Sequence, residues 1–151
     1  MYRQTVLPQR HVIGIKIRTS NDTHQKDAFP LCEKFQQEKM KDSIPNKLND
    51  DLLAIYTEYE KDYTKPYTYF LGCEVASIKE IPDGMSLLII PKSSYAVFSN
   101  KGPFPHSLIK TWQDIWSSDV KRAYATDFEV YPSHFDRSQV SDIPIYISIS
   151  G

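Results

Sequence analysis

The chain has 151 residues, of which 40% are hydrophobic and 25% are charged, and its formal net charge is −1. This length suits one domain with one sizeable core, spanning residues 1–151, and the composition is typical of a globular protein and excludes a disordered one. Positive charge is scattered along the chain, which argues against direct binding to a nucleic-acid backbone.

The sequence also argues against a secreted or membrane protein. The N-terminal residues lack an apolar run long enough for a signal peptide, and no later segment could span a bilayer. Cys32 and Cys73 have neither metal-type spacing nor a disulfide framework, so we expect both to be buried thiols in a reducing compartment. These features predict a cytoplasmic protein without a membrane partner.

The chain begins with a predicted strand followed by a helix. Residues 10–20 are rich in β-branched side chains, which is typical of a strand, and residues 21–26 are turn-like. A helix is expected from about Ala28, with Pro30 in its first turn. Its apolar face is formed at helical spacing by Leu31, Cys32 and Phe35.

The segments 51–60 and 66–77 are strand-like and are separated by a short polar stretch, which predicts a hairpin. After a turn and a short apolar run at 85–90, a strand is expected over 93–101, and Pro105 is suited to open a second helix. The apolar stripe of that helix comprises Leu108, Ile109, Trp112, Ile115 and Trp116. Two last strands are expected over 127–132 and 143–150.

The order strand, helix, strand, strand therefore occurs twice, over about 10–77 and 93–150. Three local matches share nearly the same offset, namely Leu31-x-x-x-Phe35 with Leu108-x-x-x-Trp112, Tyr56 with Tyr131, and Phe70 with Tyr146. This predicts an α+β fold of duplicated βαββ units with pseudo-two-fold symmetry, in which antiparallel sheets each carry a helix. A cleft between the halves would be a usual place for a ligand.

Three segments carry a resemblance to a known family. They are LAIYTEYEKDYTKPYTYFLGCEV (Leu53–Val75), IPKSSYAVFSNKGPF (Ile90–Phe104) and DFEVYPSHF (Asp127–Phe135) followed by IYISI (Ile145–Ile149). In this order they resemble the GyrI-like effector-binding domain, a ligand-sensing module that also occurs at the C-terminus of some AraC- and MerR-type transcription regulators. The resemblance implies small-molecule binding in a central cleft, and we expect no cofactor.

The chain departs from this family at two positions. Ser93 stands where the family often has Gly, and Cys32 stands where it often has Trp in the first helix. The second departure would reshape one wall of the cleft.

Glu129 is the strongest candidate for a residue that contacts the ligand. Strand alternation places Phe128 and Val130 on one face, which we expect to face the helix, and Glu129 and Tyr131 on the other, toward the cleft. The resemblance implies that this glutamate lies at the cleft floor and contacts the ligand. A carboxylate among aromatic rings is partly desolvated, which strengthens its attraction for a cation or a hydrogen-bond donor. The alternative is a solvated glutamate on an exposed strand.

Aromatic residues are expected to line the cleft from both halves, where they suit planar or cationic ligands. The candidates are Tyr56, Phe70, Phe104, Trp112, Tyr131 and Tyr146. The alternative for each is packing in the core or across strands.

Other chemistry lacks support in the sequence. His11, His24, His106 and His134 are far apart and have no ligand-type neighbours, so we expect no metal site. The common hydrolase and nucleotide-binding signatures are absent.

Three hypotheses follow, and we favour the first. The chain binds a small lipophilic molecule, cationic or aromatic, as a stand-alone sensor or sequestering protein, with any link to transcription made through a partner because only about nine residues precede the first predicted strand. The second is a hydrolase of strained cytotoxic compounds, as some GyrI-like proteins are, with Glu129 as general base. The third is a protein-binding inhibitor of the gyrase type. The sequence leaves open whether the chain is a monomer or a dimer.

Overall fold

A computed structural model describes residues 2–133, 135–136, 138–140 and 142–150, so His134 lies outside the described residues. The elements are β1 (Tyr2–Leu7), β2 (Arg10–Thr19), α1 (His24–Gln37), α2 (Met40–Ser43), β3 (Leu52–Thr57), β4 (Tyr67–Val75), β5 (Ser86–Ile90), β6 (Ser93–Phe98), α3 (His106–Ser117), β7 (Thr126–Tyr131) and β8 (Ile145–Ser148).

The described strands form one antiparallel sheet in the order β1-β6-β8-β7-β3-β4-β2-β5. The unit β2-α1-β3-β4 is repeated as β6-α3-β7-β8, which confirms the predicted duplication, and the two units join through β3 and β7. The outer strands are exchanged between the units. The strand that precedes β2 in the chain, β1, pairs with β6, while the strand that precedes β6, β5, pairs with β2. Each half of the chain therefore contributes an outer strand that pairs with the other half.

Two features of the N-terminal part differ from the sequence prediction. Strand β1 was not expected, because it is an edge strand without a buried residue and its pairing with β6 is a long-range contact. Helix α1 begins at His24, so Pro30 lies in its second turn instead of its first. Since proline lacks an N–H group, it donates no helical hydrogen bond to the turn before it.

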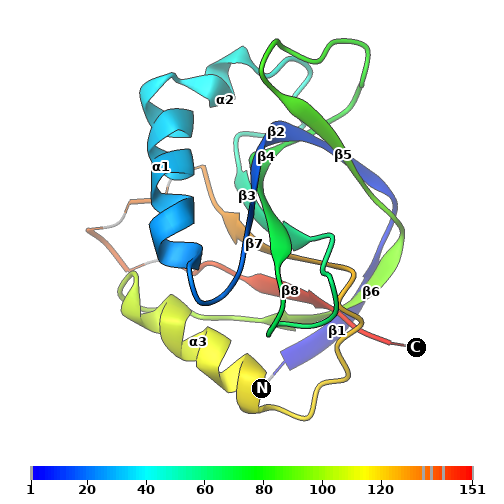
Figure 1. Cartoon of the computed structure of the whole chain (residues 1–151), viewed down its shortest axis with the longest axis vertical. Coiled ribbons are helices and arrows are strands. Elements are labelled where there is room, and N and C mark those ends of the chain that lie inside the picture. Colours follow the sequence, from blue (N-terminus) through cyan, green and yellow to red (C-terminus); the bar gives the residue numbers. More distant parts are fainter. Residues whose placement is uncertain (1, 134, 137, 141, 151) are drawn as a thin grey trace.

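Both long helices lie on the same face of the sheet (Figure 1). Under α1, buried Ala28, Leu31 and Phe35 pack on side chains of β2 and β4. Under α3, buried Ile115 packs on side chains of β6 and β8. Between the two contact areas, β3 and β7 lie at the centre of the sheet.

The other face of the sheet has its own core, because the chain curves round that side from β1 into β2 and from β5 into β6 (Figure 1). This core contains Val12, Leu53, Ile55, Phe70, Ile90, Tyr95 and Phe128. The expectation that Phe128 and Val130 face a helix is therefore wrong. Both pack on the face that the curled strands cover, and that cover is a tertiary feature which strand alternation cannot show.

Two glycines let β2 and β4 approach closely. Gly14 and Gly72 are register partners, and a Cβ atom at Gly14 would lie 1.8 Å from the carbonyl oxygen of Leu71. Because backbone atoms cannot swing aside, we expect Gly14→Ala to lower the free energy of unfolding by about 2–3 kcal/mol. Gly84→Ala is a suitable control, since it meets open space and incurs only the backbone strain of φ +81°, about 1 kcal/mol. Urea denaturation of both variants tests this, and equal losses would contradict it.

Candidate ligand-binding site

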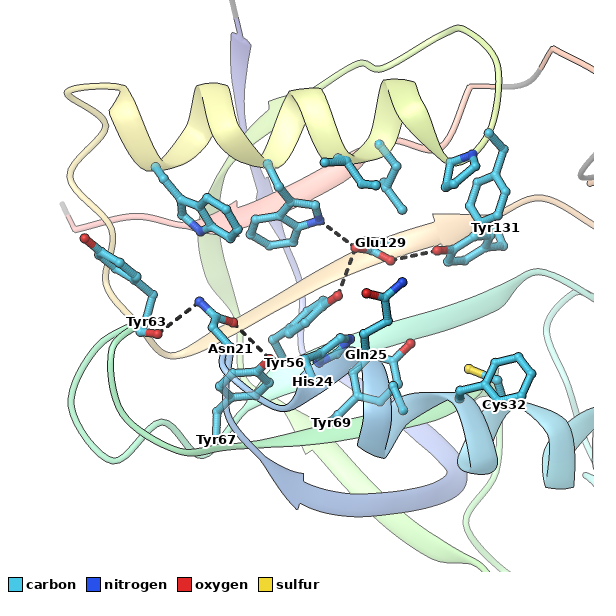
Figure 2. Close-up of a pocket in the computed structure, with 18 of the residues that line it drawn as sticks. Asn21, His24, Gln25, Cys32, Tyr56, Tyr63, Tyr67, Tyr69, Glu129 and Tyr131 are labelled. Carbon is cyan, nitrogen blue, oxygen red and sulfur yellow. Dashed lines mark hydrogen bonds between the residues drawn. The ribbon is translucent and has the colours of Figure 1, made fainter.

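A cavity of about 500 Å³ lies between α1 and α3, above β3, β4 and β7 (Figure 2). Most of its wall is aromatic or aliphatic. The lining residues are Asn21, His24, Gln25, Ala28, Phe29, Cys32, Tyr56, Tyr59, Tyr63, Tyr67, Tyr69, Phe104, Pro105, Leu108, Ile109, Trp112, Trp116, Arg122, Glu129 and Tyr131. The sheet forms the floor and the two helices form the walls, so the cavity is built across the pseudo-symmetric halves.

Glu129 lies at the centre of this cavity and is held by three side chains. It is only 2% exposed. The indole Nε1–H of Trp112 and the hydroxyl of Tyr56 donate hydrogen bonds to Oε2 at 2.6 and 3.0 Å, and the hydroxyl of Tyr131 donates to Oε1 at 2.9 Å (Figure 2). The donors come from β3, β7 and α3, so the carboxylate position depends on both halves of the fold.

The surroundings of Glu129 supply hydrogen bonds but no countercharge. Burial raises the pKa of Glu129 above its ordinary value, and the hydrogen bonds from Trp112, Tyr131 and Tyr56 offset part of that rise. Burial also raises the pKa of Tyr56 and of Tyr131 well above the usual value, so both hydroxyls keep their protons and remain donors. Among the described residues, no Lys, Arg or His forms an ion pair with Glu129.

His24 adds a ring to the cavity and not a charge. Its ring stacks on Tyr56 at 5.5 Å between centroids and meets Tyr69 edge-on at 4.6 Å. Its Nδ1 lies 2.8 Å from the hydroxyl of Tyr67. Burial lowers the pKa of His24 to about 4, although Asp27 opposes this shift. The imidazole is therefore neutral at neutral pH.

Arg122 also lines the cavity, but its charge is neutralised by Asp127. The two side chains form an ion pair at 2.8 Å and are 6% and 0% exposed. Asp127 accepts further hydrogen bonds from the hydroxyl of Tyr59 at 2.6 Å and from the backbone N–H and hydroxyl of Ser148. Glu129 is thus the one cavity residue among those described whose charge, when ionised, has no opposite charge in contact with it.

Of the residues singled out from the sequence, five line this cavity: Tyr56, Phe104, Trp112, Glu129 and Tyr131. Phe70 and Tyr146 do not. Phe70 is the register partner of Ile55 and Tyr146 that of Phe128, and residues directly opposite in a sheet share a face. Both therefore lie in or against the core on the helix-free face. Matching the two halves by sequence offset says nothing about which face of the sheet a residue occupies. Alternation along β4 places Phe70 and Tyr69 on opposite faces.

Several cavity residues were missed in the sequence. Tyr67 and Tyr69 alternate with Thr68 and Phe70 along β4, so strand parity could have linked them, but their position beside Tyr56 depends on the hairpin register. Cys73 is buried as expected, whereas Cys32 is exposed and lines the cavity. The reason is that Leu31 packs in the core under α1, whereas Cys32, the next residue around the helix, lies at the cavity.

Comparison with known proteins places the chain in a family. The model of the Cass2 family of integron-associated effector-binding proteins matches residues 5–149. The chain belongs to this family. It is thus a small-molecule-binding protein with the GyrI-like fold, as the sequence resemblance implied. Among the described residues, no helix is both long and apolar enough to cross a membrane.

Individual relatives span nearly the whole chain. A Bacillus subtilis (strain 168) protein named a putative transcriptional regulator, YobU, is 27% identical over 96% of this chain and 95% of its own length. An integron cassette protein from the mobile metagenome of Vibrio cholerae has a TM-score of 0.76 at 24% identity, covering 99% of this chain and 95% of that one. The protein SAV2435 bound to tetraphenylphosphonium has a TM-score of 0.83 at 18% identity, covering 100% of this chain and 94% of that one. The last two are solved structures, and they share the fold of this chain.

Proposed function

We propose that the chain binds a small lipophilic cation between α1 and α3, with Glu129 as the countercharge. The observation that carries this proposal is the buried carboxylate at the centre of an aromatic cavity, held by three neutral donors and without a cationic partner among the described residues. An ionised carboxylate in such a site gains more from a cation than it would in water, because the local dielectric constant is low.

The rings around Glu129 support the same ligand class. Tyr56 contacts Trp112 at 5.2 Å and Tyr69 at 5.3 Å between centroids, so the carboxylate lies beside a continuous set of aromatic faces. Each face that meets a desolvated cation contributes about 0.5–2 kcal/mol. The relative SAV2435, which has the same fold, is bound to the lipophilic cation tetraphenylphosphonium.

We further propose that the chain acts as a sensor or sequestering protein and not as a hydrolase. A general base must accept a proton from water. Three of the about four lone-pair positions of the Glu129 carboxylate already accept side-chain hydrogen bonds, which lowers its basicity and leaves one position for a water molecule. The name of the Bacillus subtilis relative favours a role in transcription regulation for the sensor.

Fluorescence titration tests the proposed ligand class. The chain has two tryptophans, Trp112 and Trp116, and both line the cavity, so a bound ligand must change the intrinsic emission. We expect saturable quenching by methyltriphenylphosphonium and a much weaker response to triphenylphosphine oxide, a neutral molecule of similar shape. Equal affinities for the two compounds would contradict a cation site, and no response to either would contradict binding of this class.

A further inference from the structure

A second hollow adjoins the cavity at the end away from Tyr131. Its volume is about 380 Å³, and its lining residues are Asn21, Asp22, Tyr63, Thr64 and Trp116. Three of these, Asn21, Tyr63 and Trp116, also line the main cavity. The two spaces are therefore adjacent, and a ligand that extended from the main cavity past these shared residues would reach the second hollow.

The shared wall is an aromatic pair held in place by one amide. The rings of Tyr63 and Trp116 stack at 6.4 Å with an interplanar angle of 22°, and the two residues are 40% and 45% exposed. The side-chain amide of Asn21 donates to the carbonyl oxygen of Tyr63 and accepts from the hydroxyl of Tyr67, both at 3.0 Å. Figure 2 shows Tyr63 and Asn21 at one end of the labelled row and Glu129 farther along it.

Asp22 provides the second hollow with a carboxylate beside aromatic rings. It is exposed, and no described residue forms a hydrogen bond or an ion pair with its carboxylate. It lines the hollow together with the exposed rings of Tyr63 and Trp116. Aromatic rings also surround the carboxylate of Glu129, and a carboxylate beside aromatic rings suits a cationic group.

We propose that this hollow is a second subsite, in which Asp22, Tyr63 and Trp116 bind the second cationic group of an elongated ligand whose first group lies at Glu129. The inference rests on the proposed function, because it needs a cation at Glu129. It adds a ligand class, that of long molecules with a positive group at each end.

A series of alkane-α,ω-bis(trimethylammonium) ions tests this proposal, with alkyltrimethylammonium ions of matched chain length as single-headed controls. We expect affinity to rise to a maximum at one spacer length for the two-headed ions only. Asp22→Asn should weaken the best two-headed ion roughly two- to fivefold, the range expected of an exposed ion pair, and should leave the single-headed ion unchanged. High salt should remove this difference, because exposed charges are screened.

Asp83→Asn is the matched control, since Asp83 is exposed and lies outside both hollows. Equal effects of Asp22→Asn and Asp83→Asn, or equal losses for the two classes of ion, would overturn the second subsite while leaving the proposed function intact. Failure of methyltriphenylphosphonium and of every ammonium ion to bind the wild type would count against the proposed function itself, and the second subsite would fall with it.

Discussion

Glu129→Gln is expected to weaken the binding of methyltriphenylphosphonium by about 30- to 100-fold, equivalent to about 2–3 kcal/mol. The substitution removes the charge and preserves the shape of the site. The amide oxygen can take the place of Oε2 and accept from Trp112 and Tyr56, while the amide nitrogen can donate to the hydroxyl of Tyr131. Affinity for triphenylphosphine oxide should change less than about threefold. A similar loss for both compounds would show that the variant distorts the cavity.

The same charge predicts how binding depends on pH. Because burial raises the pKa of Glu129 above 4.5, the ligand-free protein keeps the proton over a wider pH range than an ordinary glutamate does. The cation binds the ionised carboxylate, so binding is coupled to the loss of that proton. The affinity of the wild type should therefore fall about tenfold per pH unit below the raised pKa, whereas the affinity of Glu129→Gln should not change with pH. The raised folded-state pKa stabilises the fold at low pH, and this contribution is lost as pH rises through it. A wild-type affinity that is equally flat would contradict the role of Glu129.

Asp127→Asn is expected to lower the free energy of unfolding by about 3–5 kcal/mol, the largest loss of stability we predict. Arg122 is 6% exposed, and its Nε and one terminal nitrogen have no hydrogen-bond partner among the described residues. Asp127 is its one described side-chain acceptor, so the substitution leaves a buried guanidinium without a countercharge. Urea denaturation measures the loss.

The double variant Arg122→Met, Asp127→Asn provides the control. It removes both charges, and it should recover a large part of the stability because no buried charge is left unpaired. In Asp127→Asn alone, the free charge of Arg122 faces the cavity and should also weaken cation binding, measured at temperatures where the variant is folded. A loss below about 1 kcal/mol, or a double variant less stable than the single one, would contradict this account of the ion pair.

The hydrophobic periodicity and the order of elements were sufficient to predict the repeated βαββ pattern, because each of these segments has a strong local preference. The apolar stripe of α3 and the hairpin of β3 and β4 are local features of this kind. Strand β1 and the early start of α1 were not predicted, because β1 depends on a distant partner strand and α1 begins in a polar, turn-like segment.

The candidate site was also predicted in part. Strand alternation and the family resemblance pointed to Glu129, Tyr56, Tyr131 and Trp112, and the structure places all four around one carboxylate. The expectation that Phe128 and Val130 face a helix was nevertheless wrong. Glu129 still points into the cavity, because both helices lie on its own face of the sheet.

The sequence alone was enough to predict the repeated βαββ elements and the residue type at the centre of the site. These depend on local spacing along single strands and helices. The three-dimensional structure was needed to show that Phe70 and Tyr146 lie in or against a second core and that Asp127 neutralises Arg122. It was also needed to show that no cationic side chain among the described residues pairs with Glu129. The physical reason is that strand register, the curl of the sheet and side-chain pairing are long-range contacts between segments far apart in the chain.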